Sequence, residues 1–106
     1  MDIAGIDERA TAAVSLLKAI ANESRLIIIS VLNNQGEKSV GELEQIVGLS
    51  QSALSQHLAR LRKDGIVKTR RDAQTIYYSL GDDQVKEVLT CLKKLFCADG
   101  SVIPEL

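Results

Sequence analysis

Small hydroxyl and amide side chains gather on one predicted helix, from Ser50 to about Lys63, and they suit hydrogen bonding to nucleic-acid bases. A glutamine can make two hydrogen bonds to adenine, and a serine can bond a base or a phosphate without steric obstruction. Residues 49–59 contain no acidic side chain, whereas an ordinary exposed helix face favours Glu and Lys. This composition favours DNA contact over the alternative, a merely solvated face. The candidate base-reading residues are Gln51, Ser52, Ser55 and Gln56.

Basic residues follow that polar face directly. Residues 51–71 carry a net charge of +5, whereas residues 1–50 and residues 72–106 each carry −3. A basic segment between acidic ones is typical of a surface that binds a polyanion, and a solvated helix face is again the alternative. For the single histidine of the chain, an exposed position without any contact to DNA is an equally good interpretation. We expect the following residues to contact DNA phosphates or an adjacent groove. They are His57, Arg60, Arg62, Lys68, Arg70, Arg71 and Gln74.

Two helices and a hairpin are expected to hold these side chains in place. Ser39 and Glu42 form the Ser-x-x-Glu pattern of a capping box, which opens a short helix. Gly48 then predicts a tight turn before the polar-faced helix. Two runs with strand character follow that helix, at residues 66–70 and 75–79. A short helix, a tight turn and a longer helix form a helix-turn-helix, and a hairpin directly after it is a wing.

Three further helices are expected to form the body of the protein. They are predicted at residues 7–20, between a cap at Asn22 and an exit at Gly36, and at residues 83–96. The fold is therefore mainly α with a small β-hairpin, in the order helix-helix-helix-helix-strand-strand-helix. The last helix carries an apolar stripe. Its residues are Val85, Val88, Leu89, Leu92, Leu95 and Phe96.

The length of 106 residues predicts a single domain over residues 1–106, with an ordered core at 7–97 and a loose tail at 98–106. Aromatic residues are only 3%, which argues against a stacking platform for single strands. We find no glycine-rich phosphate loop and no set of catalytic residues, so we expect neither an enzyme nor a cofactor. Neither a membrane span nor a secretory signal is recognisable, which predicts a cytoplasmic protein with reduced thiols.

Three segments resemble the ArsR/SmtB family of bacterial repressors, and they are closest to its NolR-like and HlyU-like branches. They are Ala19–Leu26 (AIANESRL), Gly48–Leu58 (GLSQSALSQHL) with the following Leu61-Arg62, and Thr69–Ser79 (TRRDAQTIYYS). The resemblance covers roughly residues 10–97 and implies a winged helix-turn-helix homodimer formed through the first and last helices. It also implies an operator with inverted-repeat character. The apolar stripe of the last helix agrees with a dimer interface, and packing within one chain is the alternative.

The resemblance implies that the sensing sites known in this family can be looked for in this sequence. Some members bind metals through cysteines at the start of the third helix or through Asp and His pairs on the last helix. Residues 38–43 contain no Cys and the last helix contains no His, so we expect no metal site. Thiol-sensing members have a cysteine where Cys97 stands, but the usual second cysteine, near Ser30 or in the third helix, is missing here.

Cys91 and Cys97 lie about 120° apart around a helix and about 9 Å along it, which excludes a disulfide between them in an intact helix. In a dimer, cysteines of the two chains could still approach each other, or the helix end near Cys97 could unwind. The resemblance leaves Cys97 as either a sensing or an inert thiol. Cys91 is more simply interpreted as a small hydrophobic residue beside the stripe.

We predict a sequence-specific double-stranded DNA-binding transcriptional regulator, most simply a dimeric repressor. It would act either constitutively or in response to a thiol-reactive small molecule. An anti-repressor or activator of the HlyU type would use the same surface and is the first alternative. A protein-interaction module that docks an acidic partner is the second, and it would lack both the steep salt dependence and the duplex preference of a DNA-binding protein.

Overall fold

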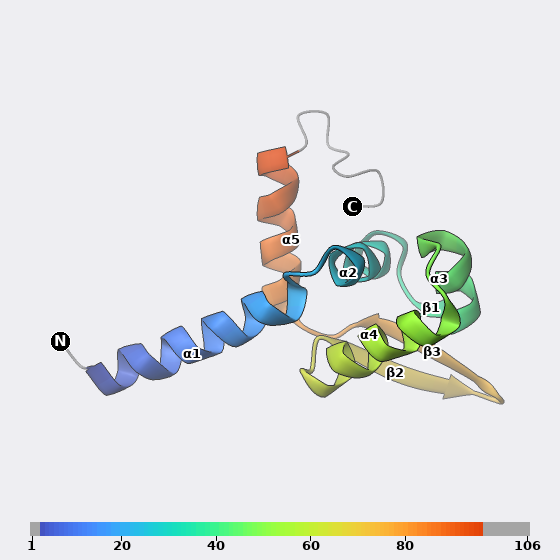
Figure 1. Cartoon of the computed structure of the whole chain (residues 1–106), viewed down its shortest axis with the longest axis horizontal. Coiled ribbons are helices and arrows are strands. Elements are labelled where there is room, and N and C mark those ends of the chain that lie inside the picture. Colours follow the sequence, from blue (N-terminus) through green and yellow to red (C-terminus); the bar gives the residue numbers. More distant parts are fainter. Residues whose placement is uncertain (1–2, 97–106) are drawn as a thin grey trace.

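Five helices and a three-stranded antiparallel sheet make up residues 3–96, the part of the chain that the computed structural model describes (Figure 1). Side chains are described from residue 7 onward, and Cys97 and the expected tail at 98–106 lie outside the described residues. The helices are α1 (Ile3–Ile20), α2 (Glu23–Gln35), α3 (Val40–Val47), α4 (Gln51–Lys63) and α5 (Asp83–Phe96). The strands are β1 (Lys38–Ser39), β2 (Val67–Asp72) and β3 (Thr75–Leu80).

The winged helix-turn-helix predicted from the sequence is confirmed, with three differences in its elements. The helix expected from residue 7 begins at Ile3 and includes Gly5, a residue that is unfavourable within a helix but does not end it here. The wing is a sheet in the order β1-β3-β2 and not a simple hairpin. Its turn has two residues instead of four, so both strands are longer than predicted, and Ala73 in the turn has a φ of 58°. Two-residue hairpin turns commonly require such a positive φ.

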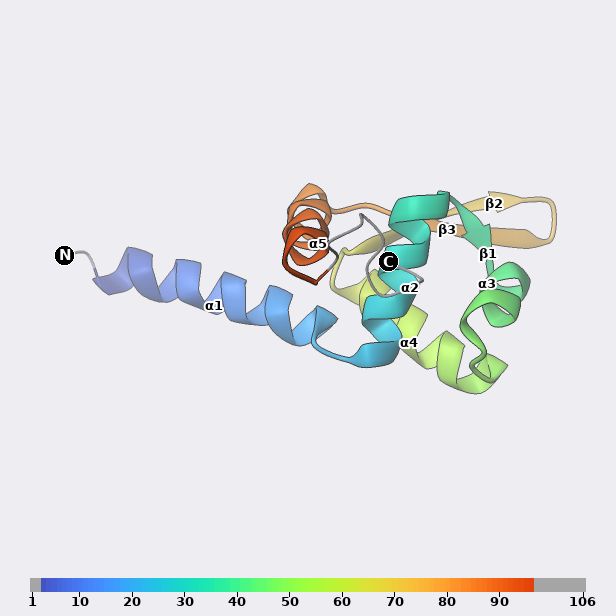
Figure 2. The same cartoon turned by 90° about the horizontal axis from the view of Figure 1, so that it is seen from above.

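The core surrounds α2, which lies in the middle of the molecule and contacts α1, α3, α4 and β3 (Figure 2). On α2, Ile28, Ile29 and Val31 are completely buried. By contrast, α1 reaches the core only at its C-terminal end, through the buried Ala19 and Ile20 and the half-buried Leu16. The remainder of α1 projects away from the body in both views, and the side chains of residues 7–15 are exposed (Figures 1 and 2).

Arg25 fastens this projecting helix to α2. Its Nε atom donates a hydrogen bond to the carbonyl oxygen of Ala19 (2.6 Å), and its Nη2 atom donates to that of Lys18 (3.1 Å). The last carbonyls of a helix have no partner within the helix and carry partial negative charge, so a guanidinium there is doubly favourable. The side chain of Asn22 accepts a hydrogen bond from the Arg25 N–H (3.1 Å) and caps α2. The segment from Ala19 to Leu26 is thus a structural joint between two helices.

Replacing Arg25 by Met keeps much of the apolar stem but removes both hydrogen bonds to α1. We expect Arg25→Met to lower the free energy of unfolding by about 1.5 kcal/mol, the lower end for hydrogen bonds to a charged group. Urea denaturation followed by circular dichroism measures this change. Arg62→Met, at an exposed position, is the control and should stay within about 0.5 kcal/mol of the original protein. Equal effects of the two variants would show that the joint does not depend on Arg25.

Candidate nucleic-acid interface

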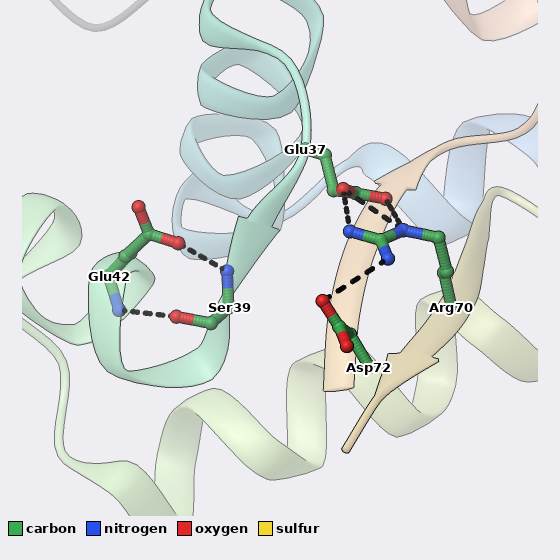
Figure 3. A network of polar contacts seen from close by, with 5 residues as sticks. All are labelled: Glu37, Ser39, Glu42, Arg70 and Asp72. Atoms are coloured by element: carbon green, nitrogen blue, oxygen red, sulfur yellow. Dashed lines mark hydrogen bonds and ion pairs between the residues drawn. The ribbon is translucent and has the colours of Figure 1, made fainter. Parts of the chain in front are cut away.

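The helix-turn-helix is set up by local hydrogen bonds at the ends of its helices. At the start of α3 the Glu42 N–H donates to Oγ of Ser39 (3.2 Å), and the Ser39 N–H donates to Oε1 of Glu42 (3.0 Å) (Figure 3). The hydrogen bonds from Ser39 hold the pKa of Glu42 below its ordinary value. Gly48 ends α3 with a φ of 72°, in the left-handed region where glycine has no Cβ penalty. Two residues later, Ser50 caps α4 by accepting a hydrogen bond from the Ala53 N–H (3.1 Å).

One side of α4 is anchored in the core and the other is free. Leu54, Leu58 and Leu61 are buried and fix the helix against the body. The four candidate base-reading residues lie in its first two turns, and all four side chains are exposed. The N-terminal end of α4 and the tip of the wing lie at the same end of the molecule, opposite the N-terminal end of α1 (Figures 1 and 2). The structure therefore brings the two predicted DNA-binding elements together on one end.

The polar residues further along α4 differ in their freedom to meet a phosphate. His57 is half-buried, and burial together with the positive charge of Arg25 lowers its pKa below the ordinary value. Arg60 lies 3.6 Å from Oδ2 of Asp64 through its Nε atom, and half of its side chain is exposed. Arg62 is exposed and has no carboxylate within 4.0 Å among the described residues. Arg62 is therefore free to meet a phosphate, as is the exposed Lys63 beside it.

On the wing, the predicted residues Lys68, Arg70, Arg71 and Gln74 all have exposed side chains. Among the described residues, only Arg70 is held by an ionic partner from outside the two wing strands. Arg70 contacts Glu37, a residue outside every motif of the sequence, through Nη2–Oε1 at 2.7 Å and Nε–Oε2 at 3.0 Å (Figure 3). These hydrogen bonds lower the pKa of Glu37 and raise that of Arg70. The two residues are 33 positions apart, and no sequence pattern links them.

Of the two predicted thiols, the structure describes Cys91, which lies away from this surface. Cys91 is exposed on α5 and lines an open groove of about 550 Å³ between α1 and α5, together with Leu16 and Val88. Cys97 lies outside the described residues. Within residues that the structure describes, no three His, Cys, Asp or Glu side chains are grouped so that they could hold a metal ion. The helices described include none long and apolar enough to span a membrane.

Comparisons with known proteins agree with this arrangement. The profile of the "Bacterial regulatory protein, arsR family" matches residues 22–69. The transcriptional activator HlyU of Vibrio cholerae is 50% identical over 97 residues, which cover 92% of this chain and 89% of HlyU. The nodulation protein NolR of Rhizobium meliloti is 48% identical over 98 residues, covering 92% of this chain and 80% of NolR.

Solved structures show the same architecture. Reduced HlyU from Vibrio cholerae superposes with a TM-score of 0.81 at 50% identity, covering 88% of this chain and 97% of that chain. The transcriptional repressor BigR from Xylella fastidiosa gives a TM-score of 0.81 at 39% identity, with coverage of 93% and 100% respectively.

A capped helix-turn-helix followed by a β wing defines a winged helix-turn-helix DNA-binding protein. The chain belongs to the arsR family of bacterial regulatory proteins. It is therefore a DNA-binding transcriptional regulator and not an enzyme.

Proposed function

We propose that this protein is a dimeric, sequence-specific repressor in the bacterial cytoplasm, which binds an operator of two inverted half-sites. The observation that carries the proposal is the acid-free polar face of α4, exposed at the same end of the molecule as the wing. A helix presented in this way fits the major groove, where its N-terminal residues reach base edges. Gln51, Ser52, Ser55 and Gln56 would read bases, while His57 would approach the backbone.

Positive residues around that face would bind the phosphates. Arg60 and Arg62 extend from the last turn of α4, and Lys68 and Arg71 extend from the wing. Gln74 lies in the turn of the wing and would reach an adjacent groove. Phosphate contacts set the position of a protein on a duplex, and base contacts select the sequence.

Dimerisation is supported by the apolar surface that α1 and α5 leave uncovered. Val14 and Leu17 on α1 are 47% and 54% exposed, and Leu95 and Phe96 on α5 are 69% and 71% exposed. A projecting helix gains little stability from propensity alone, so α1 needs a partner surface. A second copy supplies that surface through a two-fold axis, which also places two copies of α4 on two half-sites.

The function is tested by selecting duplexes from a random-sequence pool with the purified protein. We expect recovery of a sequence with two inverted half-sites about one helical turn apart. Binding to it should weaken steeply with salt and exceed binding to the unselected pool by roughly a thousandfold or more. Recovery of no preferred sequence would contradict the proposed sequence-specific binding.

An activator or anti-repressor role is the second candidate, because HlyU is named a transcriptional activator and BigR a transcriptional repressor. Both roles use the same DNA-binding surface. Transcription from a promoter that carries the selected sequence, with and without the protein, separates them.

Regulation by a thiol-reactive small molecule would act through Cys91 or Cys97. The exposed Cys91 thiol in the groove between α1 and α5 would carry a modification into the proposed dimer interface. Operator binding by reduced protein should be compared with binding after treatment with an oxidant, a persulfide or arsenite. Unchanged binding after every treatment would identify a constitutive regulator.

A further inference from the structure

We propose that the two adjacent arginines of the wing have different tasks. Arg70 is a positioning residue that holds the three strands together, and Arg71 contacts the DNA backbone. This inference rests on the proposed function, because it assigns roles within the same DNA-binding surface. It replaces the expectation from sequence that both arginines bind phosphate.

The strand register places the two side chains on opposite faces of the sheet. Arg70 is paired with Tyr77, and Arg71 is paired with Ile76. Directly paired residues point to the same face, and successive residues alternate between faces. The face of Arg71 is also the face of Val67 and Leu80, which are buried in the core. Because β2 and β3 contact α4 and α2, the side chain of Arg71 leaves the sheet on the side of the helical body.

Arg70 lies on the opposite face and reaches across the full width of the sheet. The sheet order is β1-β3-β2, so the side chain of Arg70, on β2, must cross β3 to meet Glu37 next to β1. On the way its guanidinium lies over the ring of Tyr77, 4.7 Å from the ring centroid. This path connects the outer strands of the sheet through one side chain.

Every nitrogen of the Arg70 guanidinium is directed at a carboxylate. Nε and Nη2 bond Glu37, and Nη1 lies 4.0 Å from Oδ2 of Asp72 (Figure 3). A planar guanidinium in such a two-point pair is strongly oriented. The group of two carboxylates and one guanidinium carries a net charge of −1, which does not attract a phosphate.

Arg71 has the opposite environment. Its side chain is exposed, and no carboxylate of the described residues lies within 4.0 Å of it. Its cross-strand neighbour Ile76 is 38% exposed and offers an apolar surface for the aliphatic part of the arginine. The positive charge of Arg71 is thus uncompensated and lies near the tip of the wing.

The salt dependence of DNA binding distinguishes the two roles. Each phosphate contact adds about 0.9 to the slope of log Kd against log salt concentration. The probe is the duplex that the original protein selects from a random-sequence pool, measured by fluorescence anisotropy. We expect Arg71→Gln to reduce the slope by about 0.9 for each protomer bound. When the salt concentration rises fourfold, the Kd of the original protein should therefore increase more than the Kd of the variant. The two increases should differ by a factor of about 3.5 for each protomer bound.

Arg70→Gln and its matched partner Glu37→Gln should leave this slope unchanged. Both should instead accelerate hydrogen exchange of the Tyr77 and Tyr78 amides in β3, because the contact between Arg70 and Glu37 across the sheet is lost. A slope reduced by Arg70→Gln as much as by Arg71→Gln would overturn the assignment. So would an unchanged slope in Arg71→Gln. Failure of the original protein to select any duplex would instead contradict the proposed function itself.

Discussion

Leu17→Glu is expected to give a folded monomer that no longer binds a two-half-site operator. Leu17 is 54% exposed on α1, outside the core, so the change should leave the fold of the single chain intact. In the proposed dimer the same position is covered, and a carboxylate without a partner there costs roughly 3–5 kcal/mol. The dissociation constant of the dimer should rise by more than a hundredfold.

Analytical ultracentrifugation measures the dimer, and circular dichroism checks that the helices remain. Leu17→Met is the control, because it keeps an apolar side chain of similar volume and should remain dimeric. A Leu17→Glu protein that stays dimeric and binds its operator would show that α1 does not contribute to the interface. The dimer would then have to be formed by the apolar end of α5, where Leu95 and Phe96 are exposed.

The second large effect is expected at Gln56. An amide that bonds adenine through both its oxygen and its nitrogen is worth about 1–3 kcal/mol of discrimination per half-site. Gln56→Ala should therefore weaken the selected duplex by about 5- to 150-fold per half-site, while binding to the random-sequence pool changes little. The affinity ratio between the two duplexes reports this directly.

Two further variants separate base reading from general effects. Gln35→Ala removes an exposed amide at the end of α2 and should leave both affinities unchanged. Arg62→Gln removes a charge from α4 and should weaken the selected and random duplexes alike, since phosphates carry no sequence information. If Gln56→Ala leaves the affinity ratio unchanged, Gln56 does not read a base, and the neighbouring polar residues of α4 must account for any preference.

The helix-turn-helix could be predicted from sequence because its determinants are local. The hydrogen bonds of the capping box join Ser39 and Glu42, three residues apart, and Ser50 caps α4 in the same way. Such bonds form within one turn of helix, so their residue types and spacing are visible in the sequence. The leucines that anchor α4 follow the helical period. The polar residues between them therefore lie on the opposite, exposed face of the helix.

The wing shows the limit of this reasoning. A strand of two residues is too short to show the alternating pattern of a strand. In addition, the serine of β1 is the N-cap of α3, so the sequence around it indicates a helix start and not a strand. The charges of Arg70 and Arg71 look alike in sequence. Their difference comes from alternation across the strand together with Glu37, which the fold brings from 33 residues away.

The sequence by itself therefore determined the helices, their caps and the polar face that would meet a duplex, since each depends on residues within a few positions of one another. The tertiary structure alone decided that Arg25 joins α1 to α2, that Glu37 holds Arg70, and that α1 projects with an uncovered apolar surface. These features depend on which segments the packing of the core brings together. That packing results from the burial of apolar side chains on all the elements at once, so it cannot be predicted from a local sequence pattern.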